Sequence, residues 1–357
     1  MFQNLHPHLY FIKRILIIFC YISVAEQLIA QPYTIVKNYE TQNGLPSTTT
    51  YRTLQDKNGF LWIATDNGLA KFDGKTFRIY NTGDGLVDND VPYIAIDENN
   101  KIWAFPFKKI PQVYNESTDK FEMVENIGNV DSYFGRRPFM LDAGNVALFN
   151  TKGELQISDY NRTITFNNFK YNAGVRYVGK MGTNKYLVCT PTNFYLQTIN
   201  SLDTIYKSDK IDIVHKDGNE IYTATIKTLT KFDYGENKLI KIKEKIFEQE
   251  VRSISTFDKD KYCVITNDGR AFILNGLLEN IEEIACGGFY INQVFKDNQK
   301  NLWITTKANG IVKMRQNLIQ PLLSKVLQTQ SCNKVALNNN AIVVGTTYGE
   351  IFVKPNA

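Results

Sequence analysis

A short phrase that ends in tryptophan recurs along this chain and constrains its fold more than any other feature. The 357 residues include three tryptophans, and an aspartate stands six positions before each of them, at the start of a polar turn. The copies run Asp56–Trp62, Asp97–Trp103 and Asp297–Trp303. The first two tryptophans are 41 residues apart, and the first and third are 241 apart, close to six such steps. A fixed period near forty residues indicates a fold built from repeated modules.

The repeat continues where its tryptophan is replaced. Residues 61–73 align without a gap with residues 221–233, in which Tyr222 stands at the position of Trp62. Weaker copies fill the intervals between the strong ones, so that the chain contains eight units. Their tryptophan-equivalent positions are 62, 103, 147, 187, 222, 263, 303 and 343.

Each unit has the pattern of four short strands. In the first unit, residues 49–54, 60–65, 69–72 and 76–80 show the alternation or the continuous apolar run of a strand. Turns rich in Asp, Asn and Gly separate these segments. Four-stranded sheets at this period are the blades of a β-propeller. We therefore predict an all-β fold, a β-propeller of seven or eight four-stranded blades.

The recurring polar and aromatic residues of the motif allow two interpretations. The aspartates could be paired carboxylates for glycoside hydrolysis, and the tryptophans could be platforms for sugars. We expect structural roles instead, because each aspartate recurs at the same turn of its own blade and each tryptophan lies inside an apolar strand. The residues assigned to this structural motif are Asp56, Gly59, Trp62, Thr65, Gly68, Asp97, Trp103, Tyr222, Thr225, Asp297, Trp303, Thr306 and Gly310.

The N-terminal edge of the repeat predicts a closed ring. Residues 39–45 align with residues 80–86, which end the first unit. Residues 33–39 are therefore expected to form the outer strand of a blade whose other three strands come from the last unit. We assign those three strands to residues 335–337, 341–346 and 350–353. Closure from both chain ends would remove an open sheet edge that invites aggregation.

Residues 1–30 have the pattern of an export signal. Two basic residues precede an apolar run, 15–25, that is too short to span a bilayer. We expect cleavage after Ala30, which leaves Gln31 as the new N-terminus. Lipidation at Cys20 is an alternative, but the bulky phenylalanine before it disfavours that processing. We predict an exported, periplasmic protein.

Composition agrees with one domain that fills the mature chain, residues 31–357. The hydrophobic share of 43% suffices for a sizeable core. The formal charge of the whole chain is +5, and its basic residues are dispersed, which does not favour a nucleic-acid partner. The charged run 238–245 is expected to be a solvated strand face. No other segment reaches the ~18 apolar residues of a membrane helix, so we expect no membrane span in the mature chain.

Few residues suit catalysis. The mature chain has a single histidine, His215, which argues against a Ser-His-Asp triad and against a multi-histidine metal site. We expect no catalytic residue, no metal and no cofactor. Cys189 and Cys263 fall in predicted inner strands and suit apolar packing. Disulfide pairing among the four mature cysteines, which include Cys286 and Cys332, is left open.

The motif resembles that of a known family. Its first unit contains Asn43-Gly-Leu-Pro and Asp56-x-x-Gly-x-Leu-Trp-Ile-Ala-Thr, followed by Lys71-Phe-Asp. These phrases resemble the two-component regulator propeller repeat, and with the weaker units the resemblance extends over roughly residues 33–357. The second unit departs from it at 104–107, where Pro106 should bend the strand or place it on an edge.

The resemblance implies a function. Such repeats form the exported sensor portion of bacterial hybrid or LytS-like sensor histidine kinases and of related regulators. Family members usually continue into a second propeller or an Ig-like domain, a membrane helix and a kinase or DNA-binding output, whose motifs this sequence lacks. The resemblance therefore implies a truncated or free-standing sensor propeller, without catalysis, that detects a small molecule or an oligosaccharide. Its partner would be a cognate sensor kinase or a second copy of the chain.

Two other functions are kept as alternatives. The first is an exported scaffold for protein–protein interaction that binds no small ligand. The second is a propeller lyase or glycosidase, because a fold does not determine function.

The ligand site is expected where loops break the repeat, because propellers bind ligands through the loops that join their strands. Two segments, 105–109 and 133–137, break it and combine aromatic with cationic side chains. The candidate residues are Phe107, Tyr133, Arg136 and Arg137. The alternative is an irregular loop with solvated arginines.

Overall fold

The computed structural model describes most of the chain after the leader. The described residues are 33–97, 99–107, 110–124, 139–141, 145–150, 152–158, 163–171, 174–284, 286–316, 332–338, 341–346 and 351–355. The predicted signal, residues 1–30, lies outside them. The chain divides into two compact units, of which residues 35–315 form the larger.

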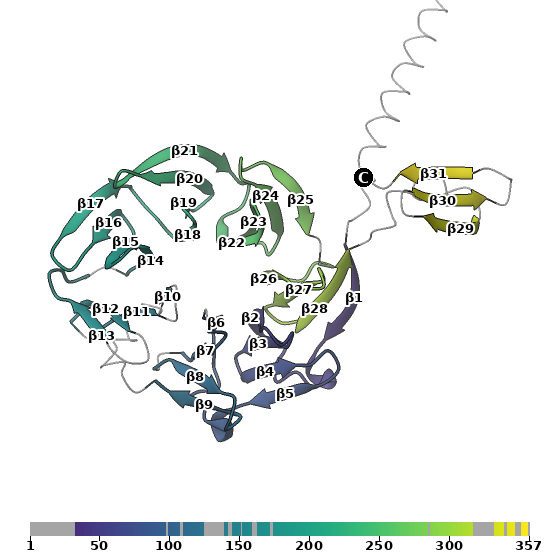
Figure 1. Cartoon of the computed structure of the whole chain (residues 1–357), viewed down its shortest axis with the longest axis horizontal. Coiled ribbons are helices and arrows are strands. Elements are labelled where there is room, and N and C mark those ends of the chain that lie inside the picture. Colours follow the sequence, from purple (N-terminus) through teal and green to yellow (C-terminus); the bar gives the residue numbers. More distant parts are fainter. Residues whose placement is uncertain are drawn as a thin grey trace, which may run out of the picture. The chain divides into compact units, whose positions relative to one another are not determined.

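The larger unit is a ring of seven four-stranded antiparallel sheets (Figure 1). The first strand of each sheet lies nearest the centre and the fourth lies at the periphery. The prediction of an all-β propeller is thereby confirmed, with seven blades. Blade 1 is β2 (Thr50–Gln55), β3 (Leu61–Thr65), β4 (Gly68–Phe72) and β5 (Phe77–Tyr80); blade 2 is β6 (Tyr93–Ile96), β7 (Ile102–Phe105), β8 (Gln112–Asn115) and β9 (Lys120–Met123); blade 3 is β10 (Phe139–Met140), β11 (Val146–Phe149), β12 (Leu155–Ser158) and β13 (Thr163–Phe166); blade 4 is β14 (Tyr177–Gly182), β15 (Lys185–Cys189), β16 (Asn193–Gln197) and β17 (Leu202–Lys207); blade 5 is β18 (Ile213–Asp217), β19 (Glu220–Thr225), β20 (Thr228–Gly235) and β21 (Lys238–Ile246); blade 6 is β22 (Val251–Asp258), β23 (Lys261–Thr266), β24 (Ala271–Asn275) and β25 (Asn280–Ile284); blade 7 is β26 (Ile291–Lys296), β27 (Leu302–Thr306), β28 (Ile311–Gln316) and β1 (Tyr33–Tyr39). Two single 3-10 turns, η1 (Thr41–Asn43) and η2 (Thr82–Asp84), follow the outer strands β1 and β5.

The repeat positions inferred from the sequence coincide with one element of the blade. Each of the first seven lies in the second strand of its sheet, which has a paired strand on either side. All residues of β3, β7 and β27 are buried. A strand covered on both faces needs apolar residues throughout, which explains why the repeat is best preserved there.

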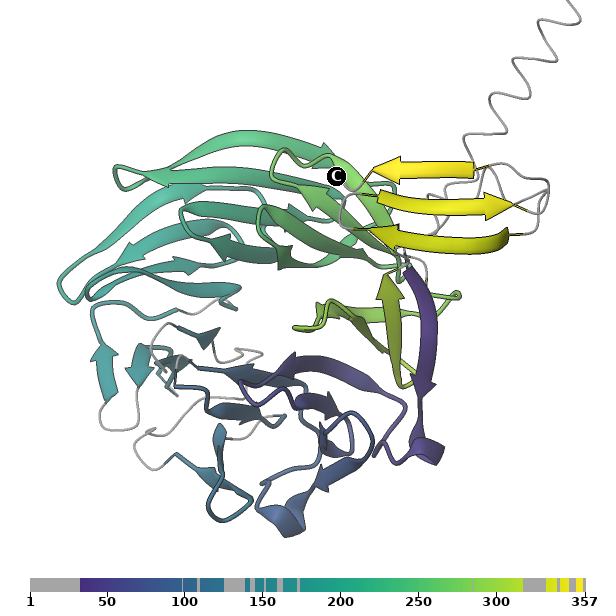
Figure 2. The same cartoon turned by 45° about the vertical axis from the view of Figure 1, so that its right-hand side comes forward.

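The ring closes with a different partner from the one predicted. β1 pairs with β28, and the closing sheet has the order β1-β28-β27-β26 (Figure 2). The assignment of residues 335–337, 341–346 and 350–353 to this blade is therefore wrong. The described residues among them belong to a separate three-stranded sheet of the smaller unit, β29 (Cys332–Asn338), β30 (Ala341–Thr346) and β31 (Ile351–Pro355).

Side-chain packing explains this choice of partner. In blade 1, the ring of Tyr80 on the outer strand stacks on Trp62, with 5.5 Å between centroids. In blade 7, Tyr39 of β1 stacks in the same way on Trp303, at 5.8 Å. Gly310 allows β1 to approach closely. Its φ is 66°, and a Cβ there would collide with the carbonyl oxygen of Tyr39. β1 thus supplies the aromatic residue that the tryptophan of blade 7 requires.

Hydrogen bonds join blade 7 to blade 1 across the closure. The side-chain amide of Asn292 donates to the carbonyl of Thr50 at 2.8 Å. The backbone N–H of Thr53 donates to Oε1 of Gln293 at 2.7 Å, and the N–H of Thr306 donates to Oγ1 of Thr50 at 2.8 Å. Each such bond contributes on the order of 1 kcal/mol, and leaving the buried partner unsatisfied costs more.

Pro106 ends a strand and does not place it on an edge. β7 stops at Phe105 and lies second in the order β6-β7-β8-β9, between two neighbours. Its ladder to β8 is short, with Trp103 opposite Val113 and Ala104 opposite Gln112. The pairing therefore ends before the residue that has no N–H to donate.

The repeated aspartate and tryptophan form one hydrogen-bonded unit. Oδ2 of Asp56 accepts from Nε1 of Trp62 at 2.9 Å, and its Oδ1 accepts from the backbone N–H of Phe60 at 3.0 Å. The same indole bond measures 3.0 Å in blade 2 and 2.8 Å in blade 7. In blade 5 Tyr222 replaces tryptophan, and its hydroxyl donates to Glu220 at 2.6 Å. One carboxylate thus fixes both the first turn of the blade and the ring of the next strand.

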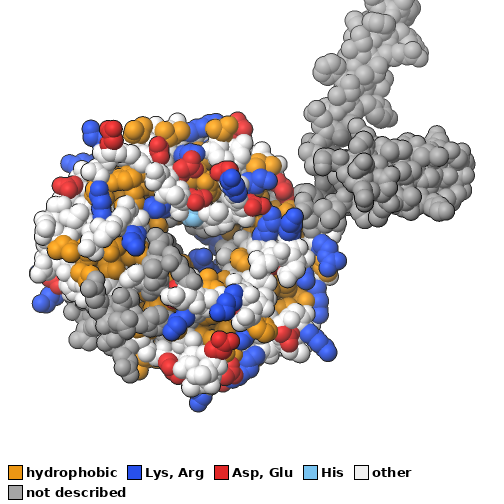
Figure 3. Space-filling view, viewed as in Figure 1, with side chains coloured by type: hydrophobic (Ala, Val, Ile, Leu, Met, Phe, Trp, Pro, Cys, Tyr) orange, Lys and Arg blue, Asp and Glu red, His pale blue; other side chains and the backbone are white. Residues whose placement is uncertain are grey.

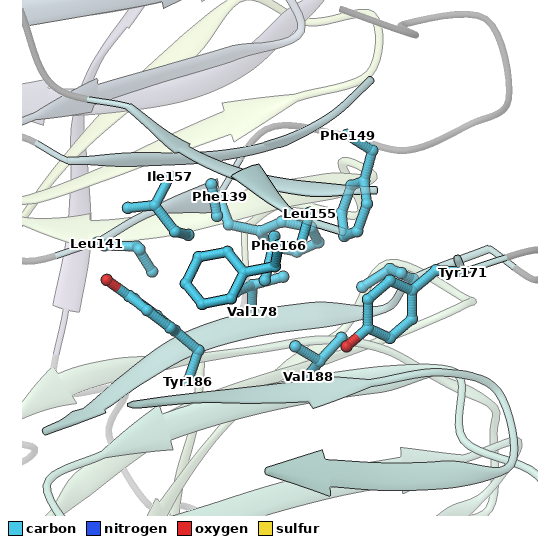
Figure 4. Close-up of a cluster of buried hydrophobic side chains, with 12 residues drawn as sticks. Phe139, Leu141, Phe149, Leu155, Ile157, Phe166, Tyr171, Val178, Tyr186 and Val188 are labelled. Carbon is cyan, nitrogen blue, oxygen red and sulfur yellow. The ribbon is translucent and has the colours of Figure 1, made fainter. Parts of the chain in front are cut away.

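Blades 3 and 4 pack together without a tryptophan. A cluster of buried aromatic and aliphatic side chains fills the space between them (Figure 4). Phe166 of β13 meets Tyr186 of β15 edge to face, with 5.4 Å between ring centroids. Aromatic volume replaces the indole hydrogen bond here, which explains why these repeats are weak in the sequence.

We predict that Asp56→Ala destabilises the ring by at least about 2 kcal/mol, because the indole of Trp62 and two turn amides lose their acceptor in a buried site. Urea unfolding followed by circular dichroism measures the change. The exposed turn residue Asp66 is the matched control, and Asp66→Asn should leave the midpoint unchanged. Equal effects of the two substitutions would contradict the assigned role of Asp56.

We also predict that residues 33–316 fold as a complete ring, whereas residues 40–316 do not. The shorter chain lacks β1, which exposes the edge of β28 and removes the partner of Trp303. Calorimetry should show one cooperative transition for residues 33–316 and none for residues 40–316. If the chain instead needed residues 332–355 to close the ring, both truncated chains would fail.

Candidate functional site

A central channel runs through the ring, and its cavity measures about 740 Å³ (Figure 3). Residues from all seven first strands line it: β2, β6, β10, β14, β18, β22 and β26. Every other strand lies farther out, so side chains of the first strands determine its chemistry.

Irregularities in the first strands direct side chains toward this channel. The pairing shifts register between Thr50 and Arg52, between Val251 and Ser253, and between Ile291 and Gln293. Such bulges change the direction of a side chain and recur at the rims of closed sheets. The residues at or next to the bulges that line the channel include Arg52, Arg252 and Gln293.

Two of the channel arginines are held by aromatic rings. The guanidinium of Arg52 lies 4.3 Å from the ring centroid of Tyr93, and that of Arg252 lies 4.4 Å from the centroid of Tyr290. Arg252 also donates from Nη1 to Oδ1 of Asn292 at 3.0 Å, and from Nη2 to the carbonyl of Ile291. Burial lowers the pKa of Arg252 from its ordinary value. Both side chains are therefore fixed before any ligand binds.

The charges around the channel are unbalanced. Lys296 pairs with Asp258 at 2.6 Å, and Asp212 pairs with Lys210 at 3.1 Å. Three further cations line the channel, Arg52, Arg176 and Arg252. Within the described part of the chain, none of these three arginines forms an ion pair. The described lining of the cavity therefore carries an excess of positive charge.

His215 adds no charge at neutral pH. Burial, and to a smaller extent the charge of Arg52, lower the pKa of His215 to about 4, and Asp217 opposes this shift. Its Nε2 lies 2.9 Å from Oγ1 of Thr256 on the next blade. The imidazole is thus a neutral hydrogen-bonding group on the channel wall.

Of the residues proposed as a ligand site from the sequence, Phe107 alone belongs to the described structure, and it is not among the described residues that line the cavity. Phe107 is exposed in the loop after β7, where its N–H donates to the carbonyl of Asp90 at 2.8 Å. Tyr133, Arg136 and Arg137 lie outside the described residues. The sequence analysis missed Arg52, Arg176 and Arg252. Their signal is a cation in or next to the first strand of a unit.

The described residues form no metal-binding site. No group of three or more His, Cys, Asp or Glu side chains there is placed to hold a metal ion. Cys189, Cys263 and Cys286 are buried and free, and burial raises the pKa of Cys263 to about 12. Nor does that part of the chain contain a helix with the length and apolarity of a membrane span.

Solved structures similar to this chain share its fold. The extracellular domain of BT3049, named as a hybrid two component system of B. thetaiotaomicron, matches with a TM-score of 0.62 and 18% identity, over 90% of this chain and 48% of that one. BT4673 of the same organism matches with a TM-score of 0.61 and 16% identity, over 88% and 44%. The chain thus spans about half the length of these structures. A streptogramin B lyase also matches, with a TM-score of 0.61 and 8% identity, over 80% and 98%.

Sequence comparison locates the motif itself. No curated protein matches the chain in sequence. The family model described as two component regulator propeller matches residues 44–67, which include β2, the Asp56 turn and β3. The motif lies in the first of the seven blades of this propeller. The chain therefore carries the two-component regulator propeller repeat.

Proposed function

We propose that the chain is the ligand-sensing propeller of a two-component signalling protein, that it works outside the cytoplasm, and that its ligand binds in the central channel. The repeat in blade 1 and the likeness to extracellular domains of B. thetaiotaomicron support the setting. The observation that carries the site is the set of three arginines in a cavity that all seven blades line, none of which forms an ion pair with a described residue.

The channel suits detection because a ligand there contacts several blades at once. The aromatic rings of Tyr93 and Tyr290 already hold two of its arginines, so little side-chain freedom is lost on binding. A cavity with a few fixed polar groups is the usual form of a small-molecule site. A cognate kinase or a second copy of the chain would then receive the signal.

The described channel residues favour binding over catalysis. His215 is neutral and its polar neighbour is the hydroxyl of Thr256, so the pair offers no carboxylate to orient the ring. General acid–base catalysis works best with a group whose pKa lies near the working pH, and a pKa of about 4 is far from neutrality. The likeness to the lyase shows the fold alone.

We predict that Ser253→Trp abolishes binding of any ligand that the channel holds. Ser253 lines the channel, and an indole there occupies space in which a ligand would lie, without removing a charged group. A thermal-shift screen of residues 31–357 against small molecules and oligosaccharides would identify a ligand, and calorimetry would measure its affinity for the variant. Asn200→Trp, in an exposed turn of blade 4, is the control and should bind normally.

Unchanged affinity in a folded Ser253→Trp protein would place the ligand elsewhere. Ser255→Trp, on the same strand, replaces that variant if it does not fold. Conversion of the ligand to a product, followed by mass spectrometry, would overturn the non-catalytic part of the proposal.

We further predict that His215 destabilises the ring in acid. Its folded pKa of about 4 lies below the ordinary value of about 6.5, so the unfolded chain binds its proton more readily. The free energy of unfolding should therefore fall between pH 6.5 and 4, by up to roughly 3 kcal/mol from this group. His215→Gln should lose less stability over that interval in urea unfolding. Parallel profiles for the two proteins would contradict the lowered pKa.

A further inference from the structure

The excess charge of the channel indicates what its ligand must supply. A cation taken partly out of water without a counter-charge is unfavourable, and proteins usually pair it. Here the chain pairs Lys296 with Asp258 and Asp212 with Lys210, yet leaves three arginines without carboxylates. The missing negative charge is therefore not provided by the described residues.

The position of Arg252 makes it a prepared anion contact. Its Nη1 and Nη2 bond to blade 7, and its face rests on Tyr290, so the guanidinium has one fixed orientation. Its Nε is buried and has no acceptor within the described structure. A fixed guanidinium loses little entropy when it binds an oxyanion, which is the reason arginine predominates at such sites.

Arg52 and Arg176 extend this positive surface around the channel. Arg52 belongs to blade 1 and Arg252 to blade 6, so the two arginines stand on either side of blade 7. Arg176 immediately precedes β14 of blade 4, across the ring. Arg52, Arg176 and Arg252 line the same cavity as His215 of blade 5.

We propose that the ligand of this channel is an oxyanion, a molecule with a carboxylate, sulfate or phosphate group that Arg52 and Arg252 hold together. Arg176 faces the remainder of the ligand from the opposite wall. This assignment rests on the proposed sensing function and names the chemical class of its ligand.

Such a ligand would also join the blades at which the ring closes. Arg252 bonds to Asn292 of blade 7, and Asn292 bonds to the carbonyl of Thr50 in blade 1. An anion held by Arg252 and Arg52 therefore connects blades 6 and 1 over this chain of hydrogen bonds. β1 and β28 belong to the closing blade and lead to both ends of the ring, so they are the strands that ligand binding should protect from exchange.

Titration calorimetry with residues 31–357 tests the proposal with three probes: inorganic sulfate, a uronic-acid disaccharide, and a neutral disaccharide of the same size. We expect the uronic-acid disaccharide to bind, the neutral one not to bind, and the affinity to fall as salt is raised. Arg52→Met and Arg252→Met should each weaken binding at least about ten-fold, since each removes a charge-assisted contact. Binding should also slow amide exchange in β1 and β28.

Arg270→Met is the matched control, because Arg270 is exposed and paired with Asp268 at 2.7 Å outside the channel lining. It should bind as the unaltered chain does. Melting temperatures show which variants are folded, and Arg252→Lys replaces Arg252→Met if the latter is not. The lysine keeps the charge but loses the planar fork, so it should still weaken binding.

The outcomes separate this assignment from the sensing proposal. Neutral disaccharide binding that Ser253→Trp abolishes, without anion binding, overturns the anion assignment and leaves the sensing function standing. Sulfate binding without disaccharide binding, lost in both arginine variants, supports an anion site for small free ions. Anion binding that survives both variants, or no binding of any probe, overturns the assignment.

Discussion

Blades 1, 2 and 7 depend on one hydrogen-bonded unit, the carboxylate that accepts from a turn amide and from an indole two strand positions beyond the turn. In blade 7, Asp297 accepts from Trp303 at 2.8 Å and from the N–H of Asn301 at 2.8 Å. A buried carboxylate is stable only when such donors satisfy it, so the aspartate and the tryptophan require each other. The six-residue spacing follows from the length of the turn plus the first residues of the second strand.

This dependence explains how much of the fold could be read from the sequence. Aspartate, turn glycine and tryptophan lie within one short segment, so a local pattern reports them, and their period predicts the blades. The closure could not be read in the same way, because it joins strands far apart in the chain. The eighth unit suggested the wrong partner for β1. The stacking of Tyr39 on Trp303, equivalent to Tyr80 on Trp62, decides the closure in space.

The candidate site escaped sequence analysis for a physical reason. Loops that interrupt the repeat are the segments whose sequence differs most from the motif. They include Phe107 and residues outside the described structure. The channel instead takes its side chains from the first strands, where the ring turns one face of each strand toward the centre. A bulge beside Arg52 and another at Arg252 determine which residue faces inward. No local pattern indicates a bulge when the strand is only six to eight residues long.

The separation of these two regions has a functional consequence. The indole bonds hold the turn and the second strand together within blades 1, 2 and 7, and aromatic contacts such as that of Phe166 with Tyr186 pack one blade against the next. The channel wall combines buried apolar residues, such as Val178, Val214 and Val294, with the polar and charged groups of the first strands. At the contact between blades 7 and 1, hydrogen bonds connect the channel residue Arg252 with Asn292 of the closing blade, and Asn292 with Thr50. A ligand in the channel would therefore act on blade 7, whose outer strand β1 comes from the N-terminal side of the ring and whose other three strands come from its C-terminal side.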